Sequence, residues 1–249
     1  MMVVERRQEL VRQVRGDGRV VAAEAARRFG VSEDSIRRDL RALAAEGLVQ
    51  RVRGGALAVQ PNPSFVDRVS RSSPVVGSIA AAVARRIEES GGVVVLDSGS
   101  TNVRVAEALT SLDVTVVTSS PAIGAAASAN GLSVIMLGGV VVADIGASVD
   151  VTAVDGLRLV RADVAVVGAC AVDPANGVSS GRAEEIAYKQ AVVQTSAELI
   201  VAAPAEKLGT TSSFHIADVG TITSLFTESL ADPTVLAAFR AAEVEVING

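Results

Sequence analysis

Six short apolar runs, rich in β-branched residues, recur between residues 93 and 227 and constrain the fold more than any other feature of this chain. Runs that are apolar on both faces belong in a parallel sheet buried on both sides. Helical patterns lie between most of them, so we predict an open, doubly wound, mostly parallel α/β sheet domain over residues 74–249. The runs are VVVLD (93–97), VTVVT (114–118), VIML (134–137), DVAVVG (163–168), LIVAA (199–203) and ITSLFT (222–227).

Small and hydroxylated residues follow four of these runs. Because ligands of parallel α/β sheets bind outside the carboxyl ends of the strands, these loops share one edge of the predicted sheet. The first loop also opens a helix, where free amides and the helix dipole favour an anion. Such residues are ordinary turn formers as well, but three loops in register favour a phosphate site. The loops are Asp97-Ser98-Gly99-Ser100-Thr101, Thr118-Ser119-Ser120, Gly138-Gly139 and Gly168-Ala169.

A different pattern occupies residues 32–46, SEDSIRRDLRALAAE. Ile36, Leu40 and Leu43 recur at helical spacing and predict a buried stripe. Ser32 is a suitable N-cap, and Gly47 is a suitable end for the helix. One face can therefore pack while the other meets phosphate or bases, and that second face carries Arg37, Arg38 and Arg41.

Arginines on a helix are usually just solvated, so the neighbouring segments decide the interpretation. Residues 5–15 and 21–29 have helical patterns, and Gly30-Val31 makes a tight turn before residue 32. After the helix, LVQRVRGGALAV predicts a small hairpin. This order is that of a winged helix-turn-helix. We predict a DNA-binding domain over residues 1–59, with candidate DNA-contacting residues Ser32, Ser35, Arg37, Arg38, Arg41, Arg51 and Arg53.

A linker over residues 60–73 is predicted between the two domains, because Gln60-Pro61-Asn62-Pro63-Ser64 breaks every regular pattern. The charge changes sign across it. Residues 1–60 contain 12 Arg and 8 acidic residues, net +4, whereas residues 61–249 contain 11 basic and 20 acidic residues, net −9. Since DNA repels acidic surfaces, contact with nucleic acid is expected at the N-terminal domain alone.

Composition excludes several other classes of protein. No apolar run reaches the roughly 18 residues of a membrane span, and MMVVERRQEL lacks the apolar region of a signal peptide, so we expect a cytoplasmic protein. No cofactor or metal is expected. Cys170 is the single cysteine and is expected to be a small buried packing residue. His215 is expected to be structural, because no Cys, Asp or Glu stands near it at metal-ligand spacing.

Two regions resemble the DeoR-type family of bacterial regulators of sugar metabolism. The first is ERRQELVRQV followed by VVAAEAARRFGVSEDSIRRDLRALAAEGLVQRVRGGA, in which SIRRDL and GLVQRVRGGA are the most specific parts. The second covers essentially all of residues 74–249, where DSGST, TSS, MLGG and EIAYK match the family's C-terminal effector domain in order. The resemblance implies a fold related to ribose-5-phosphate isomerases and a sugar-phosphate pocket.

The pocket that the resemblance implies departs from the family pattern at two points. The family often has Asp a few residues before the lysine of its KxG segment, where this chain has Ala203-Pro204-Ala205-Glu206. A lysine common in the family near Val75 and Val76 is absent. The ligand can therefore differ from that of better-known members. The loops and the resemblance together assign to the pocket Asp97, Ser98, Gly99, Ser100, Thr101, Thr118, Ser119, Ser120, Gly138, Gly139, Glu185, Lys189 and Lys207.

The lysines add an argument from composition. Only Lys189 and Lys207, of 23 basic residues, are lysine, and both fall in segments that match the pocket. Glu185 and Lys189 stand at i and i+4 on a predicted helix, which also fits a plain surface ion pair worth about 0.3–0.5 kcal/mol. We predict instead that a lysine supplies the formal charge that binds a phosphate, and that Glu185 orients Lys189 or accepts a sugar hydroxyl.

The leading hypothesis is a transcriptional regulator, most often a repressor in this family, that binds operator DNA as a dimer or larger homo-oligomer and responds to a phosphorylated sugar. The alternative is a sugar-phosphate isomerase-like enzyme with an appended DNA-binding domain. That chemistry requires closely spaced acids after a middle strand, where VVGACAVDPANG offers only Asp173. A third hypothesis, an architectural DNA-binding protein with a vestigial pocket, predicts no effect of ligand on DNA affinity.

Overall fold

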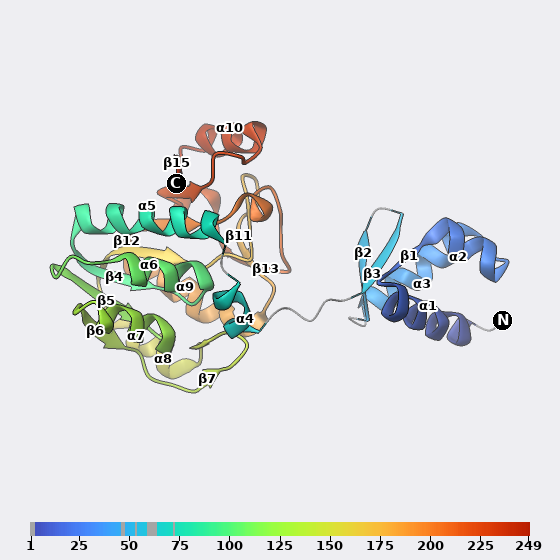
Figure 1. Cartoon of the computed structure of the whole chain (residues 1–249), viewed down its shortest axis with the longest axis horizontal. Coiled ribbons are helices and arrows are strands. Elements are labelled where there is room, and N and C mark those ends of the chain that lie inside the picture. Colours follow the sequence, from blue (N-terminus) through green and yellow to red (C-terminus); the bar gives the residue numbers. More distant parts are fainter. Residues whose placement is uncertain (1–2, 46–47, 53, 59–63, 72) are drawn as a thin grey trace. The chain divides into compact units, whose positions relative to one another are not determined.

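The computed structural model describes residues 3–45, 48–52, 54–58, 64–71 and 73–249, and the chain divides into two compact units, Met1–Pro63 and Ser64–Gly249 (Figure 1). Among the described helices, none combines the length and apolarity that crossing a bilayer requires.

The described part of the first unit is a winged helix-turn-helix. Its antiparallel sheet has the order β1-β3-β2, in which β2 and β3 form the predicted hairpin. The predicted helical stripe, Ile36, Leu40 and Leu43, is buried together with Leu10 and Val14. The elements are α1 (Val3–Asp17), β1 (Arg19–Val21), α2 (Ala22–Phe29), α3 (Glu33–Ala45), β2 (Val49–Val52) and β3 (Gly55–Ala58).

Strand β1 is the one element of this unit that the sequence analysis did not predict. Its central residue, Val20, is buried, and β1 pairs with β3 where Gly55 approaches Val20. A Cβ atom at Gly55 would lie 2.0 Å from the Val20 carbonyl oxygen, so a side chain at this position would force the strands apart. Gly55 is therefore needed for β1 to pair with β3 as well as for the turn of the hairpin.

A buried carboxylate joins helices α1 and α3. Asp39, on α3, is 2% exposed and accepts hydrogen bonds from Arg6 Nε at 2.6 Å and Arg7 Nε at 3.1 Å, both from α1. The charge on Asp39 is thus matched by two guanidinium groups whose positions α1 sets. Predicting this pair from sequence would have required knowing which face of α1 meets α3.

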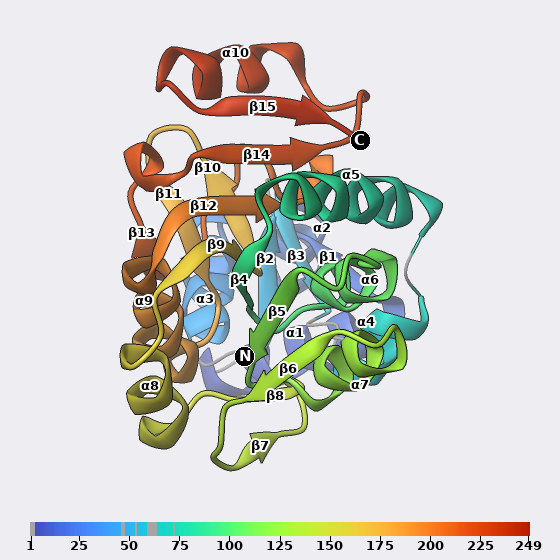
Figure 2. The ribbon, with the colours of Figure 1, turned by 90° about the vertical axis from the view of Figure 1, so that its left-hand side faces the viewer.

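The second unit contains the predicted parallel sheet. Seven described strands pair in parallel in the order β15-β14-β12-β9-β4-β5-β6 (Figure 2). Six of them lie within two or three residues of the predicted runs, and β15 was not predicted because EVIN is short and half polar. The strands are β4 (Gly92–Leu96), β5 (Val114–Thr118), β6 (Ser133–Met136), β9 (Ala162–Val167), β12 (Ser196–Ala202), β14 (Ser224–Thr227) and β15 (Glu245–Asn248).

Helices cover both faces of this sheet. In Figure 2, α5 (Pro74–Ser90), α6 (Ser100–Ala108) and α7 (Pro121–Ala129) lie on one face, and α8 (Val151–Arg158) and α9 (Ile186–Thr195) lie on the other. Side chains along each strand alternate between two cores, one on each face of the sheet. In β4, Val94 and Leu96 pack in the core under α5, α6 and α7, and Val95 packs in the core under α8 and α9. The apolar runs of the sequence are continuous because both faces of each strand are buried.

Residues 64–70, which the sequence analysis placed in a polar linker, begin the second unit as helix α4 (Phe65–Ser70). The Ser64 hydroxyl caps it by accepting a hydrogen bond from Asp67 N at 3.1 Å. Phe65 is buried against Gly146, where a Cβ atom would lie 2.3 Å from the ring. The other additional elements are β7 (Val141–Val142), β8 (Ala147–Ser148), β10 (Ala171–Asp173), β11 (Gly177–Ser180), β13 (Phe214–Ala217) and α10 (Pro233–Ala241).

Candidate functional site

The candidate site lies at the point where the strand order of the sheet reverses. β4 lies between β5, which follows it in the chain, and β9, after which the chain continues to the other edge. Ligands of doubly wound sheets bind in a crevice outside the strand ends at such a point, and we call the region at the carboxyl ends of β4 and β9 the crevice. Asp97 follows β4 and Gly168 follows β9, and the amide of Gly168 donates to Asp97 Oδ2 at 2.8 Å.

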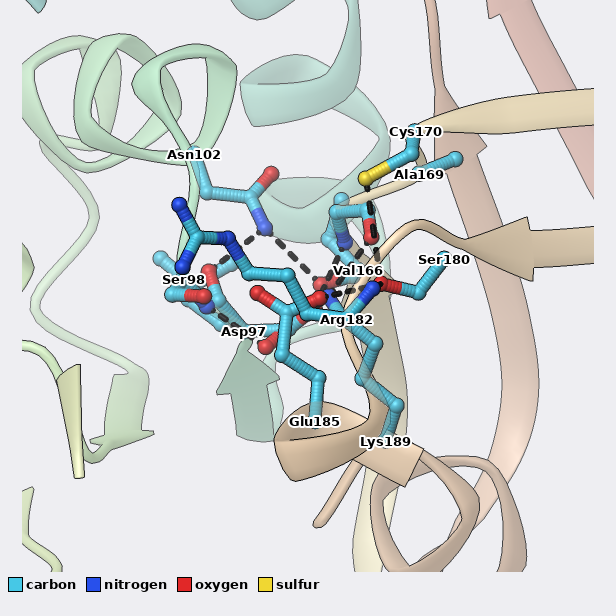
Figure 3. A network of polar contacts seen from close by, with 12 residues as sticks. Asp97, Ser98, Asn102, Val166, Ala169, Cys170, Ser180, Arg182, Glu185 and Lys189 are labelled. Atoms are coloured by element: carbon cyan, nitrogen blue, oxygen red, sulfur yellow. Dashed lines mark hydrogen bonds and ion pairs between the residues drawn. The ribbon is translucent and has the colours of Figure 1, made fainter. Parts of the chain in front are cut away.

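A buried ion pair occupies this crevice (Figure 3). Lys189, from α9, donates to Asp97 Oδ2 and to the Gly168 carbonyl at 2.7 Å, and the amide of Ser98 donates to Asp97 Oδ1 at 2.7 Å. Asp97 is 0% and Lys189 3% exposed. Burial raises the pKa of Asp97, and the charge of Lys189 and the hydrogen bonds from Lys189 and the Gly168 amide oppose that rise. Burial also opposes the charge on Lys189, yet the Asp97 and Glu185 carboxylates raise its pKa overall.

Glu185 lies beside this pair without bonding to Lys189. It is 7% exposed and accepts a hydrogen bond from the Ser180 hydroxyl. The plain alternative of a surface ion pair at i and i+4 is therefore wrong: both residues are buried, and Lys189 pairs with Asp97 from another element. Glu185 influences Lys189 through its charge.

Further cations face the same crevice from three other segments. Lys207 donates to the Ala169 carbonyl at 2.9 Å, and in the described residues no carboxylate forms a salt bridge with it. Burial lowers the pKa of Lys207, and the positive charges of Lys189 and Arg68 act in the same direction. Arg68, on α4, donates to the Asp144 carbonyl at 2.9 Å, and Arg182 lies 3.8 Å from the Asp144 carboxylate.

Cys170 is exposed, so the expectation of a small buried packing residue is wrong. The residue follows β9 by three positions and stands outside the sheet, with its Sγ 3.8 Å from the Ser180 hydroxyl. Its neighbours Ala169 and Ala171 are buried, so the side chain of Cys170 alone faces outward at this position between β9 and β10. Cys170, Ser180, Arg182 and Arg68 are all at or near the crevice, and the sequence analysis selected none of them for the site.

In the predicted loop after β5, two hydroxyls hold the backbone in place and one has no hydrogen-bond partner in the described residues. Thr118 Oγ1 donates to the Leu96 carbonyl at 2.7 Å, and Ser120 Oγ donates to the Gly146 carbonyl at 2.8 Å. The hydroxyls of Ser119 and Tyr188 are fully buried and have no hydrogen-bond partner in the structure as described, although they lie close together. Burial raises the pKa of the Tyr188 phenol, which therefore stays a neutral donor.

The DSGST loop ends in the N-terminus of α6. Gly99 is the N-cap residue with φ 149°, and its carbonyl accepts the first helical bond from Val103 N at 3.1 Å. The amides of Ser100, Thr101 and Asn102 therefore have no acceptor within the helix. The Asn102 side chain, also missed from the sequence, fixes the loop by donating to the Asp97 and Val166 carbonyls at 2.8 and 2.9 Å.

The nearest neighbours of Gly138 and Gly139 lie at the N-terminus of α8. A Cβ atom at Gly139 would lie 2.3 Å from Asp150 Oδ1, and one at Gly138 would lie 3.3 Å from Thr152. Asp150 caps α8 and also accepts a hydrogen bond from Val140 N at 2.8 Å. These glycines permit a tight turn after β6.

In the first unit, α3 presents the predicted arginine face. Arg37, Arg38 and Arg41 are exposed, and Arg37 pairs with Glu33 at 2.6 Å. Ser32 caps the helix as predicted, since its hydroxyl accepts from Ser35 N at 3.2 Å and lies 2.9 Å from the Ser35 hydroxyl. The backbone of Arg51 lies in β2, but its side chain is outside the described part, as is the whole of Arg53.

No group of three or more His, Cys, Asp or Glu residues that could hold a metal ion is found in the described residues. Asp173, which the enzyme hypothesis would use, accepts hydrogen bonds from Ala175 N at 3.0 Å and Asn176 N at 2.9 Å and so stabilises the turn between β10 and β11. His215 lies 3.4 Å from Asp218 on the surface, so an acidic residue does stand near it, three positions along the chain, contrary to the premise of the sequence analysis.

A winged helix-turn-helix unit joined to a doubly wound sheet with a cationic crevice defines a DNA-binding protein with a separate sensor domain. Family comparison gives the same division: residues 6–62 match the DeoR-like helix-turn-helix domain, and residues 77–229 match the DeoR C terminal sensor domain. The chain belongs to the DeoR family.

Two relatives span nearly the whole chain. It is 27% identical over 249 residues to the uncharacterized HTH-type transcriptional regulator YulB of Bacillus subtilis, covering 99% of this chain and 96% of that protein. It is 26% identical over 233 residues to the glycerol-3-phosphate regulon repressor of Haemophilus influenzae, covering 92% and 91%. Among solved structures, ribose 5-phosphate isomerase from Plasmodium falciparum is similar with a TM-score of 0.36 and 20% identity, over 53% of this chain and 52% of that one.

Proposed function

We propose that this protein is a cytoplasmic transcriptional repressor whose affinity for operator DNA is controlled by a phosphorylated sugar bound in the crevice between β4 and β9. The observation that carries the proposal is the uneven charge of the crevice. Asp97 neutralises Lys189, whereas Lys207 bonds to a carbonyl, forms no salt bridge in the described structure and lies near Arg68. A phosphate would supply the opposite charge for Lys207.

The groups around the cations suit the rest of such a ligand. The amides at the N-terminus of α6 face an anion favourably, and the unpartnered hydroxyls of Ser119 and Tyr188 can bond to sugar hydroxyls. Glu185 is the candidate acceptor for another hydroxyl. The Haemophilus relative, a glycerol-3-phosphate regulon repressor, is named for a small phosphorylated polyol, which supports this ligand class.

Helix α4 offers a route from the ligand to the DNA-binding unit, because it is the first element after the linker. Its Arg68 reaches the crevice and holds the Asp144 carbonyl, and its Phe65 packs on Gly146. Gly146 in turn accepts a hydrogen bond from Ser120, in the loop after β5. A ligand that moves Arg68 or this loop would move α4, and so it would bind the two conformations of the protein differently, as control of operator affinity requires.

On the DNA side, α3 is the proposed recognition helix. Arg37 and Arg38 would read bases and Arg41 would contact phosphate, with Arg51 and Arg53 of the wing as further phosphate contacts. One winged unit buries little DNA-facing surface, so we propose that at least two copies bind paired half-sites.

The test is to measure binding of a panel of sugar phosphates and the matching free sugars by calorimetry. We expect a sugar phosphate to bind and the matching free sugar not to bind. Lys207→Ala should weaken binding of the sugar phosphate by about 10- to 100-fold, the range of a charge-assisted hydrogen bond. Arg161→Ala, an equal charge change at an exposed site, is the control. Equal binding of the free sugar would refute the proposed ligand class.

Two further measurements separate the alternatives. Operator binding with and without the ligand tests the architectural hypothesis, which predicts no change. NMR of the ligand with catalytic amounts of protein tests the enzyme hypothesis, which predicts interconversion of aldose and ketose phosphates.

A further inference from the structure

One surface of the second unit carries no charge. Residues 114–143 contain no Asp, Glu, Lys, Arg or His, although 20% of the chain is charged. These 30 residues include the interior strand β5, where uncharged residues are ordinary, but also α7, β6 and β7, which lie at one edge of the unit (Figure 2). We call the exposed surface of α7, β6 and β7 the uncharged edge.

The uncharged edge is also where exposed apolar side chains gather. Five of the 14 large apolar side chains that are exposed in the described residues fall between positions 135 and 142, so they are not scattered singly as on an ordinary surface. They are Ile135 (49% exposed), Met136 (47%), Val140 (76%), Val141 (47%) and Val142 (37%).

Both faces of β6 contribute to this surface. Met136 points to the α7 side, where Gly124 leaves room for its sulfur, and neighbouring Ile135 points to the opposite face. A groove of about 370 Å³ runs between α7 and β6, lined by Pro121, Gly124, Ala125, Ser128, Val134 and Met136. β6 is the last strand of the sheet, and among the described strands none pairs with its outer edge. Covering this edge requires both a strand and apolar groups above and below it.

The opposite edge of the same sheet is protected in the usual way. Its last strand, β15, carries Glu245, and Arg240 and Glu243 stand just before it. Charged side chains on an edge strand oppose pairing with another chain. The contrast within one sheet indicates that β6 is open for association and β15 is closed to it.

We propose that the uncharged edge is the contact between two copies of this chain, with β6 of one copy antiparallel to β6 of the other about a two-fold axis. An uncharged surface has no attraction for a charged partner, whereas a second copy presents an equally uncharged and apolar surface. The two-fold brings strand edge to strand edge, and each copy's sheet and helices then cover Ile135 and Met136 of the other. A single peptide strand would pair the backbone but leave the side chains on both faces half exposed.

The proposal is independent of the identity of the effector. It gives the two copies that paired half-sites would need, and it places the crevice outside the contact, since Asp97 and Lys189 lie between β4 and β9 in the middle of the sheet. Disruption of the dimer should therefore weaken operator binding while leaving sugar-phosphate binding intact.

The first experiment measures the mass of the full-length protein by sedimentation velocity at micromolar concentration. We expect the parent to have twice the 25.4 kDa mass of the chain, or a multiple of that doubled mass. The Ile135→Glu variant should have half the mass of the parent assembly. Leu230→Glu is the control, because Leu230 is 91% exposed and lies next to α10. A monomeric parent, or an Ile135→Glu variant with the parent's mass, would overturn the proposal.

The second experiment does not depend on how well the Glu variant folds. In a Cys170→Ser background, Ile135→Cys should form a disulfide between two copies under mild oxidation, and Leu230→Cys should not. The opposite pattern, or crosslinking of both to the same extent, would show that β6 does not meet β6.

Discussion

Asp39 in the first unit and Asp97 in the second are both buried carboxylates paired with cations, yet their surroundings differ. Two guanidinium groups from one helix match Asp39, and α1 and α3 enclose the three side chains. Asp97 has one lysine and two amides, and the crevice also holds Lys207, which forms no salt bridge in the described residues, and the buried hydroxyls of Ser119 and Tyr188, which have no hydrogen-bond partner there. Asp39 completes a contact between two helices, whereas the Asp97 cluster has donors left over.

This difference separates a structural ion pair from a binding site. A buried polar network that only stabilises the fold satisfies its own groups, because each unsatisfied group costs free energy. Unsatisfied donors at the crevice are therefore a cost to the folded protein that a ligand can remove. The comparison predicts that substitutions at Asp39 act on stability alone, whereas those near Asp97 act on ligand binding as well, and that removing Lys189 has a pH-dependent effect on stability.

The largest effect is expected for Asp39→Ala. Removing the carboxylate leaves two guanidinium groups at the helix contact without a partner, at a cost of about 3–5 kcal/mol to the first unit. Thermal unfolding of the full-length protein should show a lower melting temperature for the transition of the first unit and an unchanged melting temperature for that of the second unit. A lower melting temperature for the second unit instead would contradict the expectation that the two units unfold independently.

Lys189→Met should cost about 3 kcal/mol at pH 7.5 and less at pH 5. Burial already raises the pKa of Asp97 with the lysine present, and removing the lysine raises it further. A carboxyl whose folded pKa exceeds its unfolded value stabilises below the unfolded pKa, near 4, and that contribution is lost as pH rises through the folded pKa. Urea unfolding of parent and variant at both pH values measures this; an equal loss at both would mean that Asp97 does not take up a proton.

Local patterns predicted the three helices and the hairpin of the first unit and six strands of the second, but not the side-chain contacts between residues far apart in the sequence. The strands followed from continuous apolar runs, and the cap at Ser32 and the stripe of Ile36 followed from spacing of a few residues. The pairing of Lys189 with Asp97 joins residues 92 positions apart and depends on where α9 packs against the sheet. The placements of Arg68 and Cys170 likewise depend on where α4 and the loop after β9 lie, which no local pattern records.

A smaller effect is expected on the DNA-binding face. Arg38→Ala should weaken binding of an operator fragment by about 1–3 kcal/mol if its guanidinium reads a base. Arg37→Ala should cost less, because Arg37 must first leave Glu33. Arg12→Ala is the control, since it removes the same charge from an exposed position on α1. Fluorescence anisotropy at two salt concentrations checks this, and equal losses for Arg12 and Arg38 would indicate a purely electrostatic effect.

The smallest effect is expected for Glu33→Gln, which breaks an ion pair of the exposed kind. The side chains of Arg37 and Glu33 are 53% and 41% exposed, so water screens their attraction and already solvates both charges. The substitution should change the stability of the first unit by less than about 1 kcal/mol, including the loss of a negative charge at the start of α3. Because salt screens such pairs, the difference should shrink further in 1 M salt, as measured by urea unfolding. A loss as large as that of Asp39→Ala would mean that exposure does not distinguish the two pairs, and that Glu33 holds α3 in place as Asp39 does.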